Sequence, residues 1–171
     1  MQNHFALFHL PESFAINTSA LDKAYHEVQG QVHPDRFVNG SDAEKRVAMQ
    51  WATRANEAYQ TLRNPLRRAS YMCELHGVDL QVESNTAMPM AFLMQQMEWR
   101  EALDEIKAGK DVTALAQLDT ELAVAWKSQV DRIAILLGSS DYTDAGVAVR
   151  ELMFLDKFRA EIAYLFDQLE G

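Results

Sequence analysis

The sequence predicts an all-helical protein of two domains, and three observations favour that fold class. The 171 residues include only seven Gly and four Pro, so the chain has few of the residues that make turns. Valine- and threonine-rich alternating runs, which are typical of strands, are absent, and apolar residues recur instead at spacings of three and four. Hydrophobic residues make up 48% of the chain, which is enough for one buried core or two small ones.

We expect the first long helix to begin at an N-cap among residues 17–19 and to carry one apolar face. That face consists of Leu21, Ala24, Tyr25, Val28 and Val32. The helix has to stop at His33, because the following proline disfavours the α conformation there and Pro34 itself has no amide donor.

A second helix is expected after Ser41, which forms a capping box with Glu44. Its predicted apolar face consists of Val47, Trp51, Ala55, Ala58 and Leu62. Asn64-Pro65 ends this helix and starts a third, which Gly77 terminates. The first two helices therefore flank an exposed loop of about eight residues, 33–40.

Three further helices are expected in the second half of the chain, as an antiparallel bundle. The first follows Pro89 and ends at Gly109, and its buried stripe consists of Phe92, Trp99, Leu103 and Ile106. Asp111 caps the next helix, which runs to residues 138–140, and the last helix opens near Asp141. We expect a first domain over residues 1–76, a linker over 77–87 and a second domain over 88–171.

Charge divides the chain in a similar way. Residues 1–74 carry eight basic and eight acidic side chains, whereas residues 75–171 carry eight basic and 17 acidic ones, so the whole formal charge of −9 falls on the second part. This negative charge argues against a nucleic-acid or membrane partner. No stretch reaches the ~18 apolar residues of a membrane span, and the start lacks the basic region of a signal peptide. We therefore expect a cytoplasmic protein.

Two interpretations of His33-Pro34-Asp35 are open from these residues alone: an ordinary polar turn, or an acid–base pair of an enzyme. The enzyme interpretation is disfavoured, because side chains on a convex turn point outward and the sequence offers no nucleophile or metal partner beside them.

The residues that flank this turn change its interpretation. The loop residues His33-Pro34-Asp35-Arg36-Phe37 are followed by Ala55-Asn56-Glu57-Ala58-Tyr59, Asn64-Pro65 and Arg67-Arg68-Ala69. This ordered set resembles the J-domain of the DnaJ-type co-chaperones. The resemblance implies that the loop and the helix before it dock on an ATPase chaperone of the heat-shock class and stimulate its ATP hydrolysis. A stiff turn that presents one imidazole and one carboxylate suits this role, because it has little entropy to lose on binding. By position, the chaperone-binding residues are Lys23, His26, His33, Pro34, Asp35 and Arg36.

A second apolar group lies off the buried stripe of the helix after Pro89. It comprises Leu93, Met94 and Met97, with charged neighbours at Glu98, Arg100 and Glu101. Met153 and Phe154 likewise fall off the main stripe of the last helix. From the pattern alone, these residues either form a thioether-rich surface for a partner or pack against the first domain.

The whole chain resembles the HscB family of iron-sulfur co-chaperones. The likeness includes the opening Phe5-Ala6-Leu7-Phe8-His9-Leu10-Pro11, the run over residues 91–106 and Phe154-Leu155-Asp156-Lys157. It implies an L-shaped bacterial protein that delivers an IscU-type scaffold to an HscA-type ATPase chaperone. The scaffold-binding residues fall by position on Leu93, Met94, Met97, Glu98, Arg100, Glu101 and Phe154.

The resemblance implies neither an enzyme nor a cofactor. The paired cysteines of eukaryotic relatives are absent, so no metal site is expected, and the lone Cys73 is expected to be buried. The alternative is a general J-domain co-chaperone that presents unfolded polypeptides. The chain lacks the Gly/Phe-rich linker and cysteine-rich repeats of those family members, which favours the iron-sulfur co-chaperone.

Overall fold

The computed structural model describes residues 2–80 and 88–171, and in those residues every regular element is helical. The predicted all-helical fold is therefore confirmed. The chain divides into two compact units, Met1–Met72 and Cys73–Gly171. Most of the predicted linker, residues 81–87, lies outside the described residues, so the domain boundaries of the sequence analysis stay a prediction.

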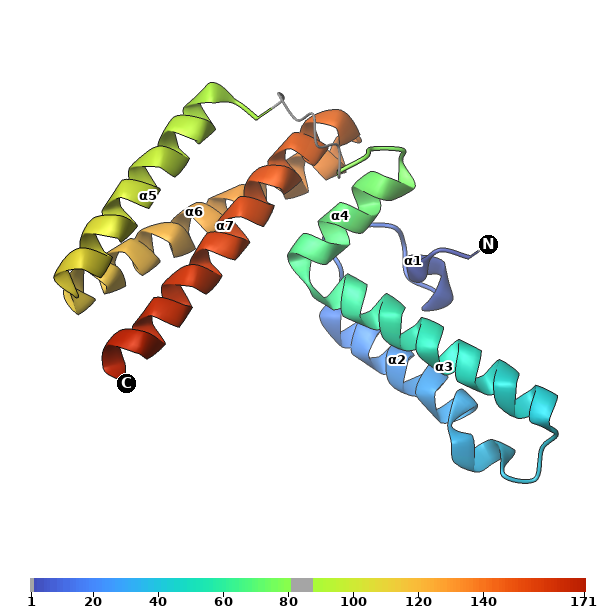
Figure 1. Ribbon diagram of the computed structural model, residues 1–171. Helices are drawn as coiled ribbons and strands as arrows, with labels where there is room; N and C mark the ends of the chain where they lie inside the picture. The colour runs from blue at the N-terminus through green and yellow to red at the C-terminus, as the bar shows by residue number, and fades with distance from the viewer. Residues whose placement is uncertain (1, 81–87) are drawn as a thin grey trace. The chain divides into compact units, whose positions relative to one another are not determined.

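The first unit is built on a helical hairpin (Figure 1). Its elements are α1 (His4–Leu7), α2 (Thr18–Val32), the 3₁₀ turn η1 (Pro34–Phe37), α3 (Asp42–Arg63) and most of α4 (Pro65–Leu75). Side-chain caps set the starts of the two long helices, as predicted. The Asn17 side chain accepts from the amide of Ala20 at 3.1 Å, and Ser41 Oγ accepts from the amide of Glu44 at 3.1 Å.

Aromatic contacts hold the hairpin together. The rings of Tyr25 on α2 and Tyr59 on α3 stack with centroids 4.1 Å apart. The Tyr59 hydroxyl donates to the Asp22 carboxylate at 2.7 Å, and this hydrogen bond raises the pKa of Tyr59. The short α1, which the sequence analysis missed, adds the buried side chains of Phe5 and Leu7 to the core of this unit.

The apolar face predicted for α3 is wrong at its first two positions. The side chains of Val47 and Trp51 are 51% and 38% exposed, whereas the buried positions are Ala48, Ala55, Ala58, Thr61 and Leu62. The sequence pattern gave weight to the large apolar side chains, but the buried stripe of α3 is built mostly from alanines. Two large apolar residues therefore remain at the surface near the start of α3.

The second unit contains three long helices, α5 (Met90–Gly109), α6 (Val112–Gly138) and α7 (Tyr142–Glu170). The starts of α6 and α7 agree with the prediction, because Asp111 caps α6 and Asp141 caps α7. Lys110 and Ser140 adopt the left-handed conformation in the turns that precede these helices, with φ of 50° and 57°. This conformation is uncommon for residues other than glycine.

The core of the second unit lies between α6 and α7 and is closed by one stripe of α5. The α5 stripe consists of Trp99, Leu103 and Ile106, as predicted, while Phe92 is half-buried. Cys73 is buried, which confirms the sequence expectation and raises the pKa of its thiol to about 11. A search of the described helices finds none with the length and apolar character needed to cross a membrane.

The segment after α4 packs against the start of α7. Gly77 takes the left-handed conformation with φ of 82°, as expected of the residue that ends α4. Beyond it, Val78 lies so close to Gly146 that a Cβ on that glycine would stand 2.7 Å from Val78 Cγ1. Gly146 is therefore required by close packing, even though it lies within a helix.

We expect the same substitution at two helical glycines to have opposite effects on stability. Gly30→Ala in α2 meets nothing within 4 Å, so it should raise the free energy of unfolding of the first unit by about 0.5 to 1 kcal/mol. Gly146→Ala should lower that of the second unit by about 1 kcal/mol, because overpacking outweighs the gain in helix propensity. Native-state hydrogen exchange would measure both units, and stabilisation by Gly146→Ala would contradict the close approach of Val78.

Candidate functional site

The first candidate site is the turn His33-Pro34-Asp35, which joins α2 to η1. His33 has an extended backbone with φ of −60° and ψ of 136°, as the residue before a proline should. Its Nδ1 accepts from the amide of Asp35 at 3.2 Å and lies 3.5 Å from Asp35 Oδ2. The His33 and Asp35 side chains are 59% and 88% exposed, so the predicted exposed loop is confirmed.

This geometry makes the turn rigid while leaving its polar groups available. A neutral His33 ring that accepts at Nδ1 carries its proton on Nε2, which can then donate to a partner. The Asp35 carboxylate remains in water, and its charge is held close to the imidazole by the turn itself. Both side chains lie at the surface rather than in an enclosed cavity, which suits binding to another macromolecule better than catalysis.

The other predicted chaperone-binding residues lie on the surface of the first unit. Lys23 and His26 are exposed on α2, and Arg36 is exposed on η1. Helix α2 also carries the acidic residues Asp22 and Glu27, and the Asp22 carboxylate accepts a hydrogen bond from the Tyr59 hydroxyl. The surface before the turn therefore has mixed charge rather than a strongly basic face, and electrostatic steering by it should be weak.

The second candidate site is an apolar surface on α5, here called the α5 patch, that comprises Leu93, Met94 and Met97. Leu93, Met94 and Met97 are 39%, 58% and 64% exposed, so none of them belongs to the core of the second unit. That they form a surface for a partner stays a prediction. Unbranched thioether side chains adapt their shape to a partner. An exposed apolar group of this kind on a helix face is typical of a protein-binding surface.

An aromatic cluster from α5 and α7 lies beside the patch. The Phe154 ring meets Phe92 edge-on at 5.8 Å between centroids and stacks on Trp99 at 6.4 Å and on Phe158 at 5.6 Å. Offset and edge-on pairs of this kind stabilise beyond the area that they bury. Phe154 is half-buried, so it belongs both to the packing of α5 on α7 and to the accessible surface.

The charged residues of the predicted scaffold-binding set have different surroundings. Glu98 and Glu101 are exposed, and Glu98 accepts from the Gln95 side chain at 3.3 Å. Arg100 instead forms a two-pronged ion pair with Glu161 of α7, with N–O distances of 2.6 and 2.8 Å. These hydrogen bonds raise the pKa of Arg100 and lower the pKa of Glu161. This ion pair therefore binds Arg100 of α5 to α7.

The sequence analysis missed Glu161 and the other polar contact of α5 with its neighbours. Trp99 Nε1 donates to Glu121 of α6 at 3.1 Å. Arg100 and Glu161 are 61 residues apart, and the periodicity of a single helix gives no information about pairs on different helices. The residues of the α5 patch could be predicted because they are apolar and lie outside the buried stripe of their own helix, and the sequence of that helix alone shows this.

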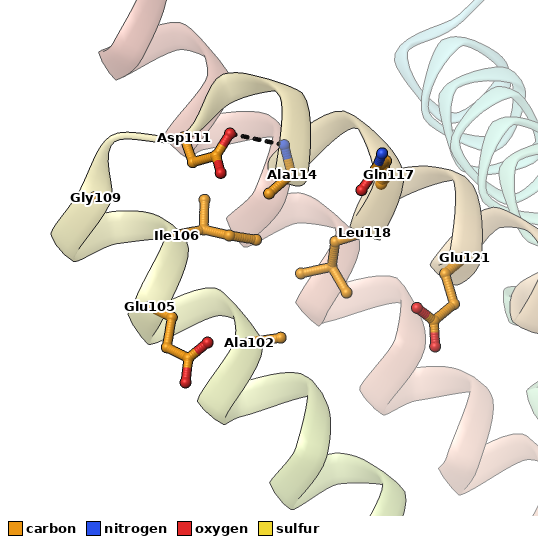
Figure 2. A pocket seen from close by; sticks show the side chains of 9 residues that line it. All are labelled: Ala102, Glu105, Ile106, Gly109, Asp111, Ala114, Gln117, Leu118 and Glu121. Atoms are coloured by element: carbon orange, nitrogen blue, oxygen red, sulfur yellow. Dashed lines mark hydrogen bonds between the residues drawn. The ribbon is translucent and has the colours of Figure 1, made fainter.

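A hollow of about 720 Å³ lies between α5 and α6, near the turn that connects them (Figure 2). Two of its three acidic lining residues are already engaged, because Asp111 accepts from the amide of Ala114 at 3.0 Å and Glu121 accepts from Trp99. The third, Glu105, is exposed. In residues 2–80 and 88–171, no group of three His, Cys, Asp or Glu side chains is arranged to hold a metal ion. We therefore assign no chemistry to this hollow.

Comparison with known sequences identifies relatives along the whole chain. The chain is 54% identical over 169 residues to the "Co-chaperone protein HscB homolog" of Paraburkholderia xenovorans, covering 99% of this chain and 97% of that protein. It is also 54% identical over 168 residues to the protein of the same name from Burkholderia cenocepacia, covering 98% and 96%. The family model described as "HSCB C-terminal oligomerisation domain" matches residues 88–163.

Solved structures show the same likeness. "Chaperone HscB from Vibrio cholerae" superposes with a TM-score of 0.86 at 34% identity, covering 98% of this chain and 99% of that one. The human co-chaperone protein HscB gives a TM-score of 0.89 at 26% identity, covering 96% and 82%. With relatives this similar over nearly the full length of both chains, the chain belongs to the HscB family of co-chaperones.

Proposed function

We propose that this co-chaperone stimulates the ATPase of an HscA-type heat-shock chaperone and presents an IscU-type iron-sulfur scaffold to it. The turn His33-Pro34-Asp35 would act on the chaperone, and the α5 patch would hold the scaffold. The observation that carries the proposal is the exposure of Leu93, Met94 and Met97 beside a packed aromatic cluster, in a member of the HscB family.

The chemistry of each surface suits its proposed partner. A rigid turn with a donor on His33 and an anion on Asp35 loses little conformational freedom when it docks. On the α5 patch, the apolar side chains are flanked by Glu98 and Glu101, so the scaffold surface that binds here should be apolar with a basic rim. Phe154 would contribute the half-buried aromatic anchor that is common at binding hot spots.

One chain that carries both surfaces raises the effective concentration of the scaffold at the chaperone without any new contact. In this role the protein binds two proteins and itself catalyses no reaction. Its partners include neither nucleic acid nor membrane, in keeping with the net charge of −9. We propose that it works in the bacterial cytoplasm; its relatives of the same family include bacterial proteins.

Removal of either functional group of the turn should abolish ATPase stimulation and leave scaffold binding unchanged. His33→Gln removes the imidazole that accepts from the Asp35 amide, and Asp35→Asn removes the exposed negative charge. Both positions are at the surface, so stability should change by less than about 0.5 kcal/mol. Steady-state ATP hydrolysis and calorimetric titration with the scaffold would measure the two activities. Loss of both in a folded variant would contradict the separation of the two sites.

Truncation of the patch should weaken scaffold binding without unfolding the protein. Leu93→Ala with Met97→Ala removes two exposed apolar side chains, and loss of a binding hot spot should raise the Kd at least about tenfold. A matched control is Val124→Ala with Ile135→Ala on α6, whose side chains are 66% and 70% exposed. Equal affinity of the patch variant and the control would exclude the patch as the binding surface.

The complete proposal predicts synergy in the ATPase assay. Hydrolysis by an HscA-type chaperone should rise more with this protein and an IscU-type scaffold together than the sum of the two separate stimulations. If this protein stimulates alone and the scaffold adds nothing, the client is an unfolded polypeptide, as for a general J-domain co-chaperone. If this protein does not stimulate at all, the proposed role of the turn is wrong.

A further inference from the structure

We propose that Glu161 is a positioning residue for scaffold binding, because its ion pair with Arg100 holds α5, and with it the α5 patch, in place against α7. The inference rests on the proposed function, since it assumes that the patch binds the scaffold. The resemblance to the HscB family implies that Arg100 contacts the scaffold directly. In this inference Arg100 instead pairs with Glu161 and acts on binding through the placement of α5. This role also adds a residue from a second helix to the determinants of binding.

The contacts of Arg100 orient its guanidinium toward α7. Both terminal nitrogens donate to Glu161, one to each carboxylate oxygen, at 2.6 and 2.8 Å. The same guanidinium lies 5.0 Å from the centroid of the Phe158 ring on α7. Planar pairing with a carboxylate together with contact to an aromatic ring fixes the orientation of an arginine side chain.

The first half of α5 needs such a contact because little else secures it. Within α5, which the structure describes in full, no residue before Trp99 is buried. The N-cap residue Pro89 makes no side-chain cap hydrogen bond. The α5 patch therefore lies on the N-terminal side of Trp99 and Arg100, the two residues that bind α5 to α6 and α7. Phe92 adds an edge-on contact with Phe154.

The position of the pair also sets its expected strength. The Arg100 and Glu161 side chains are 44% and 34% exposed, and exposed ion pairs contribute little to the stability of a fold. The pair is therefore suited to fix the placement of α5 rather than to hold the bundle together. Its loss should be detected in binding more readily than in unfolding.

A double-mutant cycle tests this role. We expect Glu161→Gln to weaken binding of an IscU-type scaffold about threefold to fivefold, the upper part of the range for an exposed pair, and Arg100→Gln to weaken it equally. The double variant should bind no more weakly than either single one. The matched control is Glu170→Gln, which removes the same charge from an exposed position on α7 and should leave the Kd unchanged.

Reversal of the pair gives a second, independent measurement. Arg100→Glu alone should weaken scaffold binding, and addition of Glu161→Arg should restore most of the affinity, because the two helices are again joined by an ion pair. A contact that Arg100 makes directly with the scaffold would not be restored in this way. Failure of the reversed pair to recover affinity would overturn the inference.

The outcomes separate this inference from the proposed function. If Glu161→Gln binds normally while Leu93→Ala with Met97→Ala binds weakly, the patch remains the binding surface and Glu161 has no role in it. If Arg100→Gln weakens binding and Glu161→Gln does not, Arg100 contacts the scaffold directly and the inference is wrong. If the unaltered protein fails to bind the scaffold, the proposed function itself is wrong.

Discussion

Burial of the Trp99 side chain is the interaction on which the attachment of α5, and with it the α5 patch, depends. The indole of this α5 residue packs on Phe154 and Phe158 of α7 and donates to Glu121 of α6, so one side chain joins three helices. Because Trp99 is attached at mid-helix, the residues before it can remain exposed without detaching α5 from the bundle. The placement of one large aromatic residue therefore allows a folded helix to present Leu93, Met94 and Met97 to solvent.

The two candidate surfaces are built in different ways. The turn at His33 is rigid because of local constraints, namely a proline and a hydrogen bond between residues two positions apart. The α5 patch depends on contacts between residues far apart in the sequence, such as Phe92 with Phe154 and Arg100 with Glu161. We therefore expect the turn to tolerate changes elsewhere in the fold, whereas the patch is sensitive to changes in α7.

The same distinction decides how much could be predicted from the sequence. Caps such as Ser41, Asp111 and Asp141 and the break at Pro34 are local signals, and the structure follows them. The exposed face of α5 was predictable because the buried stripe accounts for its other apolar positions. The exposure of Val47 and Trp51 and the pairing of Arg100 with Glu161 depend on which helices meet and how closely. A helical period within one segment does not contain that information.

The side chains that make the α5 patch adaptable also make it open to oxidation. Met94 and Met97 are more than half exposed, and Met90, one turn before Met94, is 71% exposed. Oxidants convert an accessible thioether to a sulfoxide, which is polar and chiral and no longer suits an apolar contact. Repair of this lesion requires a methionine sulfoxide reductase. Oxidation of these methionines would therefore lower the affinity of the α5 patch for the scaffold that we propose it binds.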